Sequence, residues 1–176
     1  MAVRLIDFEY CGQSIVRNTF IETGTYQGET LENAYRAGFI TLHSVEVYEP
    51  NYVAVRKKFS SLSSVHLHIG SSPTVLPRII NPTVATTFWL DAHYQGGNRA
   101  ECDPACGECP LLAELAAIFS INWNNNPMIL IDDAYMFDHR IHAGFDGNQW
   151  PTTQQIRDAL PPNYSMQEFN GILYCC

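Results

Sequence analysis

The chain has 176 residues, 46% of them hydrophobic and 16% charged, which is typical of one folded domain and unlike a disordered segment. The net charge is -8 and the lysines and arginines are scattered, apart from Arg56, Lys57 and Lys58. Because phosphate binding needs clustered cations, we expect no nucleic-acid partner.

Short apolar runs alternate with helical periodicity along most of the chain. We expect strands at residues 19–22, 42–47, 65–69, 86–90 and 128–131, and helices at residues 29–37, 50–59, 74–80, 110–120 and 153–160. Two last strands, at residues 164–169 and 172–175, flank Asn170-Gly171, which is typical of a two-residue hairpin. We interpret residues 1–18 as an N-terminal segment whose helix covers the sheet, and residues 95–109 as a Cys-rich loop.

This alternation predicts parallel strands with right-handed crossovers. The predicted fold class is α/β, a doubly wound Rossmann-like sheet of about seven strands, with five parallel strands, a C-terminal antiparallel hairpin and helices on both faces. We assign residues 1–176 to a single domain. No signal-peptide pattern and no apolar run of about 18 residues occur, which predicts no membrane partner and favours a cytoplasmic location.

The stretch from Phe20 to Thr30 reads as a strand, a glycine turn and the start of a helix. Gly24 and Gly28 let the backbone approach a ligand closely, and the free N–H groups up to Thr30 favour a carboxylate or a phosphate. An ordinary strand-to-helix turn would look similar. Glu46 ends the next strand, where a carboxylate can accept both ribose hydroxyls.

Aspartates end the fourth and fifth predicted strands. Asp91 follows the fourth strand, and Asp132 and Asp133 follow the fifth. Like charges in one cleft repel unless a cation binds, and carboxylate oxygens suit Mg²⁺ or another hard divalent ion. Mutual capping of the turns is the alternative reading.

The motifs in this order resemble class I S-adenosylmethionine-dependent methyltransferases, over residues 19–176. The segments Leu-Asp-Ala-His at residues 90–93 and Ile-Asp-Asp at residues 131–133 are most similar to the metal-dependent O-methyltransferases of the catechol and macrocin types. The resemblance implies a magnesium site and a cofactor site. The magnesium ligands would be Asp91, Asp132 and Asp133. The S-adenosylmethionine site would comprise Glu22, Thr23, Gly24, Gly28, Thr30, Glu46, Gly70, Ser71 and Asp91.

The sequence departs from the family pattern at two positions. Tyr26 stands where the middle glycine of the turn often lies, and Gly70-Ser71 replaces the acid that often meets the adenine amine. The chain is also short and lacks an inserted cap, so a homo-oligomer could complete the acceptor pocket.

We expect His93 to act as the general base that accepts the proton of the substrate hydroxyl, because it lies two residues after a metal aspartate and titrates near neutrality. Tyr94 is the second candidate. A structural hydrogen bond is the alternative role for His93. His139 and His142 could border the acceptor pocket.

Cys102, Cys106 and Cys109 lie close together in the loop after the fourth strand. With a fourth ligand from His93, Cys11, Cys175 or Cys176, they could hold a structural zinc ion. A disulfide or unpaired thiols are the alternatives. The spacing also matches the radical S-adenosylmethionine cluster motif, but that motif should open a barrel rather than follow a fourth strand.

The leading hypothesis is therefore a magnesium-assisted O-methyltransferase acting on a hydroxylated small molecule, such as a sugar or a natural product. One alternative is a non-catalytic module that binds an adenosyl or other nucleotide ligand. Another is a metal-dependent α/β enzyme of a different type, such as a hydrolase.

Overall fold

The computed structural model describes residues 18–138 and 144–176. The predicted N-terminal helix, Cys11, His139 and His142 lie outside these residues. Within them, no helix is long and apolar enough to cross a membrane.

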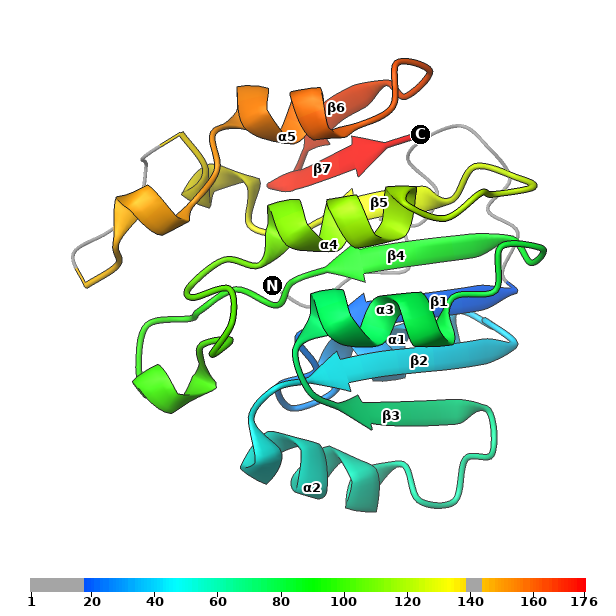
Figure 1. Cartoon of the computed structure of the whole chain (residues 1–176). Helices are drawn as coiled ribbons and strands as arrows, with labels where there is room; N and C mark the ends of the chain where they lie inside the picture. The colour runs from blue at the N-terminus through cyan, green and yellow to red at the C-terminus, as the bar shows by residue number, and fades with distance from the viewer. Residues whose placement is uncertain (1–17, 139–143) are drawn as a thin grey trace.

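Seven strands form one sheet in the order β3-β2-β1-β4-β5-β7-β6 (Figure 1). The strands are β1 (Thr19–Thr23), β2 (Thr41–Glu46), β3 (Val65–Ile69), β4 (Thr86–Leu90), β5 (Met128–Ile131), β6 (Met166–Phe169) and β7 (Ile172–Cys175). The helices are α1 (Glu29–Arg36), α2 (Glu49–Lys58), α3 (Ser72–Ile79), α4 (Leu111–Phe119) and α5 (Thr153–Ala159), with short 3-10 turns at Arg99–Glu101, Ala134–Met136 and Gly147–Gln149.

Strands β1 to β5 run parallel, and β7 joins β5 antiparallel and pairs with β6. The predicted α/β fold class is confirmed, and the element bounds shift by no more than two residues. Helix α3 starts earlier than predicted, at Ser72, because Pro73 stands in its first turn, where its missing N–H is harmless. Asn170 and Gly171 both have positive φ, as the predicted hairpin turn requires.

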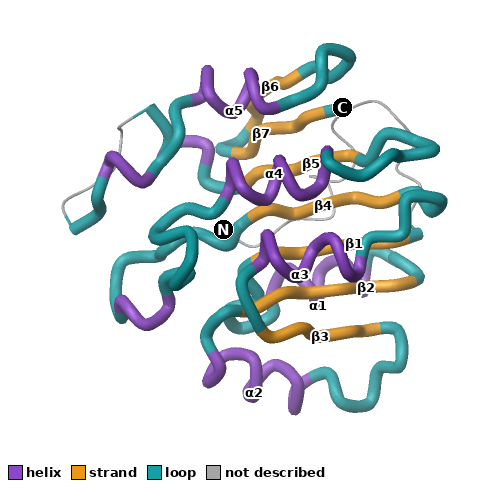
Figure 2. Tube along the Cα trace, viewed as in Figure 1, coloured by secondary structure: helices purple, strands orange, loops and turns teal. Residues whose placement is uncertain are grey.

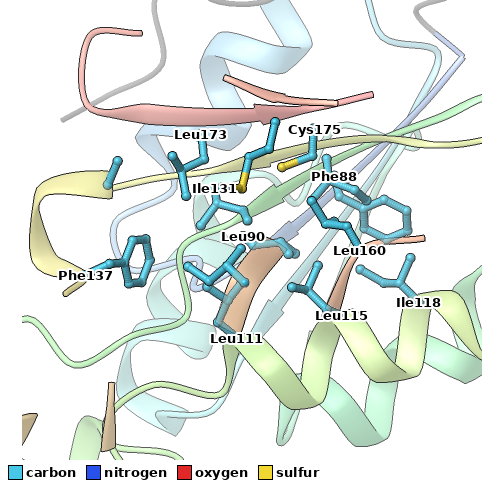
Figure 3. Packing of buried hydrophobic residues seen from close by; sticks show 14 of the residues in the cluster. Phe88, Leu90, Leu111, Leu115, Ile118, Ile131, Phe137, Leu160, Leu173 and Cys175 are labelled. Atoms are coloured by element: carbon cyan, nitrogen blue, oxygen red, sulfur yellow. The ribbon is translucent and has the colours of Figure 1, made fainter. Parts of the chain in front are cut away.

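Helices cover both faces of the sheet. On one face, α3, α4 and α5 bury Leu115, Ile118 and Leu160 against Phe88 and the side chains of β5 and β7 (Figure 3). On the other face, α1 and α2 pack on a second cluster of buried side chains. The central strands β1, β4 and β5 therefore have buried side chains on both faces, which explains their apolar runs.

The carboxyl ends of the parallel strands point to one edge of the sheet, where the long loops after β4 and β5 lie (Figure 2). Here Gly24, which directly follows β1, lies against the backbone of Asp91, which directly follows β4, and Gly24 has φ of 81°. A Cβ atom on Gly24 would lie 2.2 Å from the carbonyl oxygen of Asp91. Only glycine fits this position, and its presence sets where the chain after β4 leaves the sheet.

Substituting Gly24 by alanine is expected to destabilise the protein strongly, because the methyl group would push the backbone at Asp91 away. The control is Gly38→Ala, at φ of 91° but with no atom within 4 Å of the added Cβ. Gly38→Ala should lower the free energy of unfolding by about 1 kcal/mol, the penalty for the left-handed conformation. Gly24→Ala should lower it by at least about 2 kcal/mol more, because of the clash. Urea unfolding of both variants measures the difference, and equal losses would contradict the close approach.

Candidate functional site

A pocket of about 470 Å³ opens at the carboxyl ends of β1, β2 and β4. The strand order reverses between β1 and β4, and such switch points are where open α/β sheets bind ligands. The residues that line the pocket are Gly24, Thr25, Tyr26, Gln27, Glu29, Thr30, Val45, Glu46, Val47, Asn51, Gly70, Ser72, Asp91, Ala92, His93, Gln95, Glu101 and Asp103.

The structure places five of the nine predicted cofactor residues in this lining: Gly24, Thr30, Glu46, Gly70 and Asp91. Gly28 does not line the pocket. Its φ is 72°, and an added Cβ would lie 2.9 Å from the Phe59 ring and 3.0 Å from Val55, both buried beside α2. This glycine therefore serves the packing of α1 on α2, rather than the approach of a ligand.

Glu22 and Thr23 are also absent from the lining, because both side chains are buried beneath it. Ser44 donates a hydrogen bond to Glu22, and Thr25 in turn contacts the Ser44 hydroxyl. Burial raises the pKa of Glu22 well above its usual value, and this side chain lies beneath the pocket rather than in its lining. Ser71 does not line the pocket either, although its neighbours Gly70 and Ser72 do.

Glu46 faces the pocket with both oxygens held in place. The Tyr26 N–H donates to Oε2 at 2.9 Å, and the Tyr48 N–H donates to Oε1 at 2.8 Å. Burial raises the pKa of Glu46, although these backbone bonds oppose the shift. Tyr26 reaches its bond in the left-handed conformation, with φ of 45°, at the position where the family pattern often has glycine.

Asp91, His93 and Asp133 form the second part of the site. His93 Nε2 lies 3.1 Å from Asp91 Oδ1 and 3.3 Å from Asp133 Oδ2. Among the described residues they are the one group of three whose ligand atoms lie within 4.8 Å of one another. Asp133 takes the left-handed conformation, with φ of 52°, which turns its carboxylate toward His93.

His93 is a cation in this arrangement. Its burial disfavours the charge, but hydrogen bonds to Asp133 and Asp91 outweigh the burial and raise its pKa to about 10. An imidazolium held between two carboxylates cannot accept a proton. The expectation that His93 titrates near neutrality is therefore wrong for the protein in this state.

Asp132 does not join Asp91 and Asp133 in that group. Its Oδ1 accepts a hydrogen bond from the Asp133 N–H at 2.8 Å, so the carboxylate caps the turn after β5. Burial and the charges of Asp91 and Asp133 raise its pKa to about 7. The structure brings Asp91 and Asp133 together with His93, and the ligand set of three aspartates stays a prediction.

Tyr94 lies outside the pocket lining. Its hydroxyl donates to the Gly97 carbonyl at 2.8 Å and accepts from the Gly97 N–H at 2.7 Å. The Arg99 guanidinium stacks over its ring, 4.7 Å from the centroid. This tyrosine therefore shapes the loop through both bonds of its hydroxyl, and its role as the second candidate base stays a prediction.

The Cys-rich loop forms one wall of the pocket through Glu101 and Asp103. Its fold is held by acids: Asp103 Oδ1 accepts from the Ala105 and Cys106 N–H groups, and Glu108 pairs with Arg99 and accepts from Trp150 Nε1 at 2.9 Å. Cys102, Cys106 and Cys109 carry free thiols and form no group of metal-ligand spacing, in the part of the chain that the structure describes. The predicted zinc ligand set and the loop disulfide are thus not formed in this structure.

Sequence reasoning missed several pocket residues, including Thr25, Gln27, Glu29, Glu101 and Asp103. The first three belong to the glycine turn, so the motif did contain a signal for them. Glu101 and Asp103 reach the pocket only because the loop folds back over the strand ends, which no periodicity indicates.

Glu114 of α4 lies buried beside the site. It accepts a hydrogen bond from the Ser72 hydroxyl. Burial raises the pKa of Glu114 to about 7, although the bonds from Ser72 and Thr23 oppose the shift.

The sequence matches no protein-family model and no curated protein sequence. Solved structures do share the fold. A methyltransferase of Podospora anserina, PaMTH1 bound to SAH, has a TM-score of 0.62 at 14% identity, over 90% of this chain and 70% of that chain. CalS10 of Micromonospora echinaspora, an amino pentose methyltransferase bound to SAM, has a TM-score of 0.58 at 13% identity, over 90% of this chain and 82% of that chain. An O-methyltransferase family protein of Burkholderia thailandensis has a TM-score of 0.55 at 14% identity, over 90% of this chain and 49% of that chain. The chain therefore has the fold of these methyltransferases.

Replacing Glu114 with glutamine is expected to flatten the pH dependence of stability. The folded-state pKa is raised from 4.5 to about 7, so the carboxyl contributes stability below pH 4.5 that is lost as pH rises through 7. Glutamine keeps an acceptor for Ser72 and does not titrate. Relative to wild type, Glu114→Gln should therefore gain up to about 3 kcal/mol between pH 5 and pH 8, measured by urea unfolding at both values. A constant difference between the two proteins would show that Glu114 is ionised in the fold at both pH values.

Proposed function

We propose that this chain is an S-adenosylmethionine-dependent methyltransferase that methylates a hydroxyl group of a small molecule. The observation that carries the proposal is the charge of the pocket at the β1–β4 switch point. Five acids line it, namely Glu29, Glu46, Asp91, Glu101 and Asp103, and no lysine or arginine is among the lining residues. A positively charged sulfonium suits this lining, whereas the phosphates of a dinucleotide or of ATP would be repelled.

The cofactor orientation follows from the donors and acceptors in the lining. Glu46 would accept the ribose hydroxyls, since each of its oxygens has a lone pair left after its backbone bond. The turn from Gln27 to Thr30 would hold the methionine part, and Gly70 and Val47 border the adenine end. The sulfonium methyl would then point toward Asp91 and His93.

Methyl transfer is a displacement at carbon. The acceptor oxygen attacks the methyl carbon, the carbon–sulfur bond breaks, S-adenosylhomocysteine leaves, and the hydroxyl proton passes to solvent water. The chain mainly supplies position and charge: Asp91 would accept a hydrogen bond from the acceptor, and Gln95 and Glu101 border the space beside it.

Asp91 and Asp133 also fit a magnesium ion, which proteins commonly hold by one or two carboxylates with water or substrate completing the shell. Such an ion would lower the pKa of an acceptor hydroxyl bound to it. His93 would position the two carboxylates, because its Nε2 lies within ion-pair distance of both.

The structural neighbours support this proposal, since they include a methyltransferase bound to SAH, an amino pentose methyltransferase and an O-methyltransferase family protein. A binding module without catalysis is the second candidate. It is favoured by one observation: the His93 cation already neutralises the carboxylates that an ion or an acceptor would use.

S-adenosylhomocysteine should raise the melting temperature of the protein, and Glu46→Gln should weaken its binding by about 10-fold or more, because a charge-assisted bond to the ribose is lost. Calorimetric titration measures both proteins. Glu49→Gln is the matched control, since Glu49 is exposed and lies outside the pocket lining. The cofactor assignment fails if wild type does not bind, or if the two variants bind equally.

Mn²⁺ is a convenient probe for the hard-ion site, because free Mn²⁺ is counted by electron paramagnetic resonance. Wild type is expected to bind one ion, and Asp133→Asn should weaken binding by about 10-fold or more. Asparagine also tolerates the left-handed conformation at this position. Asp132→Asn removes a neighbouring charge but no member of the group of Asp91, His93 and Asp133, so its effect should be smaller. A larger effect at Asp132 would support the three-aspartate ligand set instead.

Turnover is then tested as release of S-adenosylhomocysteine with a panel of hydroxylated and aminated acceptors, with and without Mg²⁺. Turnover of a hydroxylated acceptor supports the transferase. Cofactor binding without turnover of any acceptor supports the binding module.

A further inference from the structure

Three histidines lie together on one edge strand of the sheet and its neighbour. His66 and His68 are on β3, which is an edge strand, and His43 is on the adjacent strand β2 (Figure 1). The register pairs His43 with His66, and residues two apart on a strand share a face. All three imidazoles therefore project from one face of the sheet, and none of them lines the pocket.

The rings are in direct contact. His43 Nδ1 lies 3.0 Å from His68 Nε2, and the His43 ring stacks on both neighbours, with centroids 5.0 Å from His66 and 5.3 Å from His68. With zinc–nitrogen bonds of about 2.0–2.1 Å, two tetrahedral nitrogen ligands lie about 3.3 Å apart. The His43–His68 pair is already close to that spacing.

The chemical state of the cluster suits a metal ion. Burial, and then repulsion from His68 and His66, lowers the pKa of His43 to about 4, and burial lowers the pKa of His68 as well. Both rings are neutral at pH 7, and His43 Nδ1 and His68 Nε2 share one hydrogen bond, so one of them carries a proton. A bound ion would move that proton to the other nitrogen of its ring and free the second lone pair. In residues 18–138 and 144–176, no recorded ion pair involves these histidines, so carboxylate pairing does not explain why they gather.

We propose that His43, His66 and His68 bind a divalent transition ion of the imidazole-preferring class, such as Zn²⁺, across the outer two strands of the sheet. His43 and His68 supply two preplaced nitrogens. As the side chains stand, the three do not meet within 4.8 Å as a group. His66 is exposed and supplies the third nitrogen by rotation of its side chain.

The ion would link β3 to β2. An outermost strand has unpaired N–H and C=O groups along one side and is held only by its single neighbour and its packing. A metal bridge between side chains adds a second attachment, and the folded state is stabilised by an amount that grows with the logarithm of the ion concentration once this exceeds the dissociation constant. Imidazole ligands select Zn²⁺, Cu²⁺ or Ni²⁺ over Mg²⁺, so this site and the carboxylates of the pocket would take different ions.

The test is a Zn²⁺ titration followed through the ring nitrogen resonances of the histidines, with each resonance assigned by a His→Gln variant. At one equivalent, the signals of His43, His66 and His68 should shift together, while Mg²⁺ should leave them unchanged. By calorimetry, His66→Gln and His68→Gln should each lower the Zn²⁺ affinity at least about tenfold. Because His66 is exposed, its variant should fold even if His43→Gln does not.

Asp91→Asn is the control for the pocket, and Cys106→Ser is the control for the thiols of the loop. Both variants should keep the wild-type shifts at His43, His66 and His68. The proposal is overturned if these resonances stay in place at one equivalent of Zn²⁺, or if His66→Gln and His68→Gln bind Zn²⁺ as wild type does. Cofactor binding in the pocket is measured separately and does not depend on the outcome.

Discussion

The site depends on how the fold accommodates acids that are removed from water at the carboxyl ends of the strands. Burying a carboxylate costs free energy unless it is neutralised, paired or well hydrogen-bonded. All three arrangements occur at the carboxyl ends of these strands. Glu22 and Glu114 have raised pKa values, Glu46 accepts two backbone N–H groups, and Asp91 and Asp133 share the His93 imidazolium. Of these acids, Glu46 and Asp91 line the pocket, and their charge helps to determine what the pocket can attract.

The close approach of Gly24 to Asp91 couples this charge to the fold. Because no side chain fits between them, the chain after β4 leaves the sheet beside the glycine turn. The path of the chain after β4 determines where Asp91, His93 and the Cys-rich loop lie. Glu108 then fixes the wall by binding Arg99 and Trp150, which lie on either side of it in sequence. A distortion at the glycine turn would therefore move the residues proposed to bind the cofactor and also the group of Asp91, His93 and Asp133.

The fold and the position of the site could be predicted because both follow from local patterns. Apolar periodicity locates the strands, and the carboxyl ends of parallel strands converge at one end of the sheet, which is why Glu46 and Asp91 line the same pocket. What the sequence could not predict is side-chain direction. Whether Asp132 or His93 completes the group with Asp133 depends on the left-handed backbone at Asp133, and the Tyr94 hydroxyl turns to Gly97 instead of the pocket. Tertiary packing decides the direction of these side chains, and composition and spacing do not reveal it. The histidine cluster was not predicted from the sequence for a related reason: His43 and His66 become neighbours only through strand register.

The two candidate cation positions differ in the atoms that they offer, and this difference bears on any metal measurement. The pocket presents carboxylate oxygens already paired with an imidazolium, so an ion that binds there must compete with the charge of His93. The cluster of His43, His66 and His68 presents neutral nitrogens, so an ion there competes with no charge of its own sign. A transition ion should therefore occupy the sheet edge before the pocket, since softer nitrogen ligands suit it better and electrostatic competition is smaller. It follows that a stabilising effect of Zn²⁺ would report on the edge strands, and only a hard ion, such as Mg²⁺ or Mn²⁺, can report on the chemistry of the pocket.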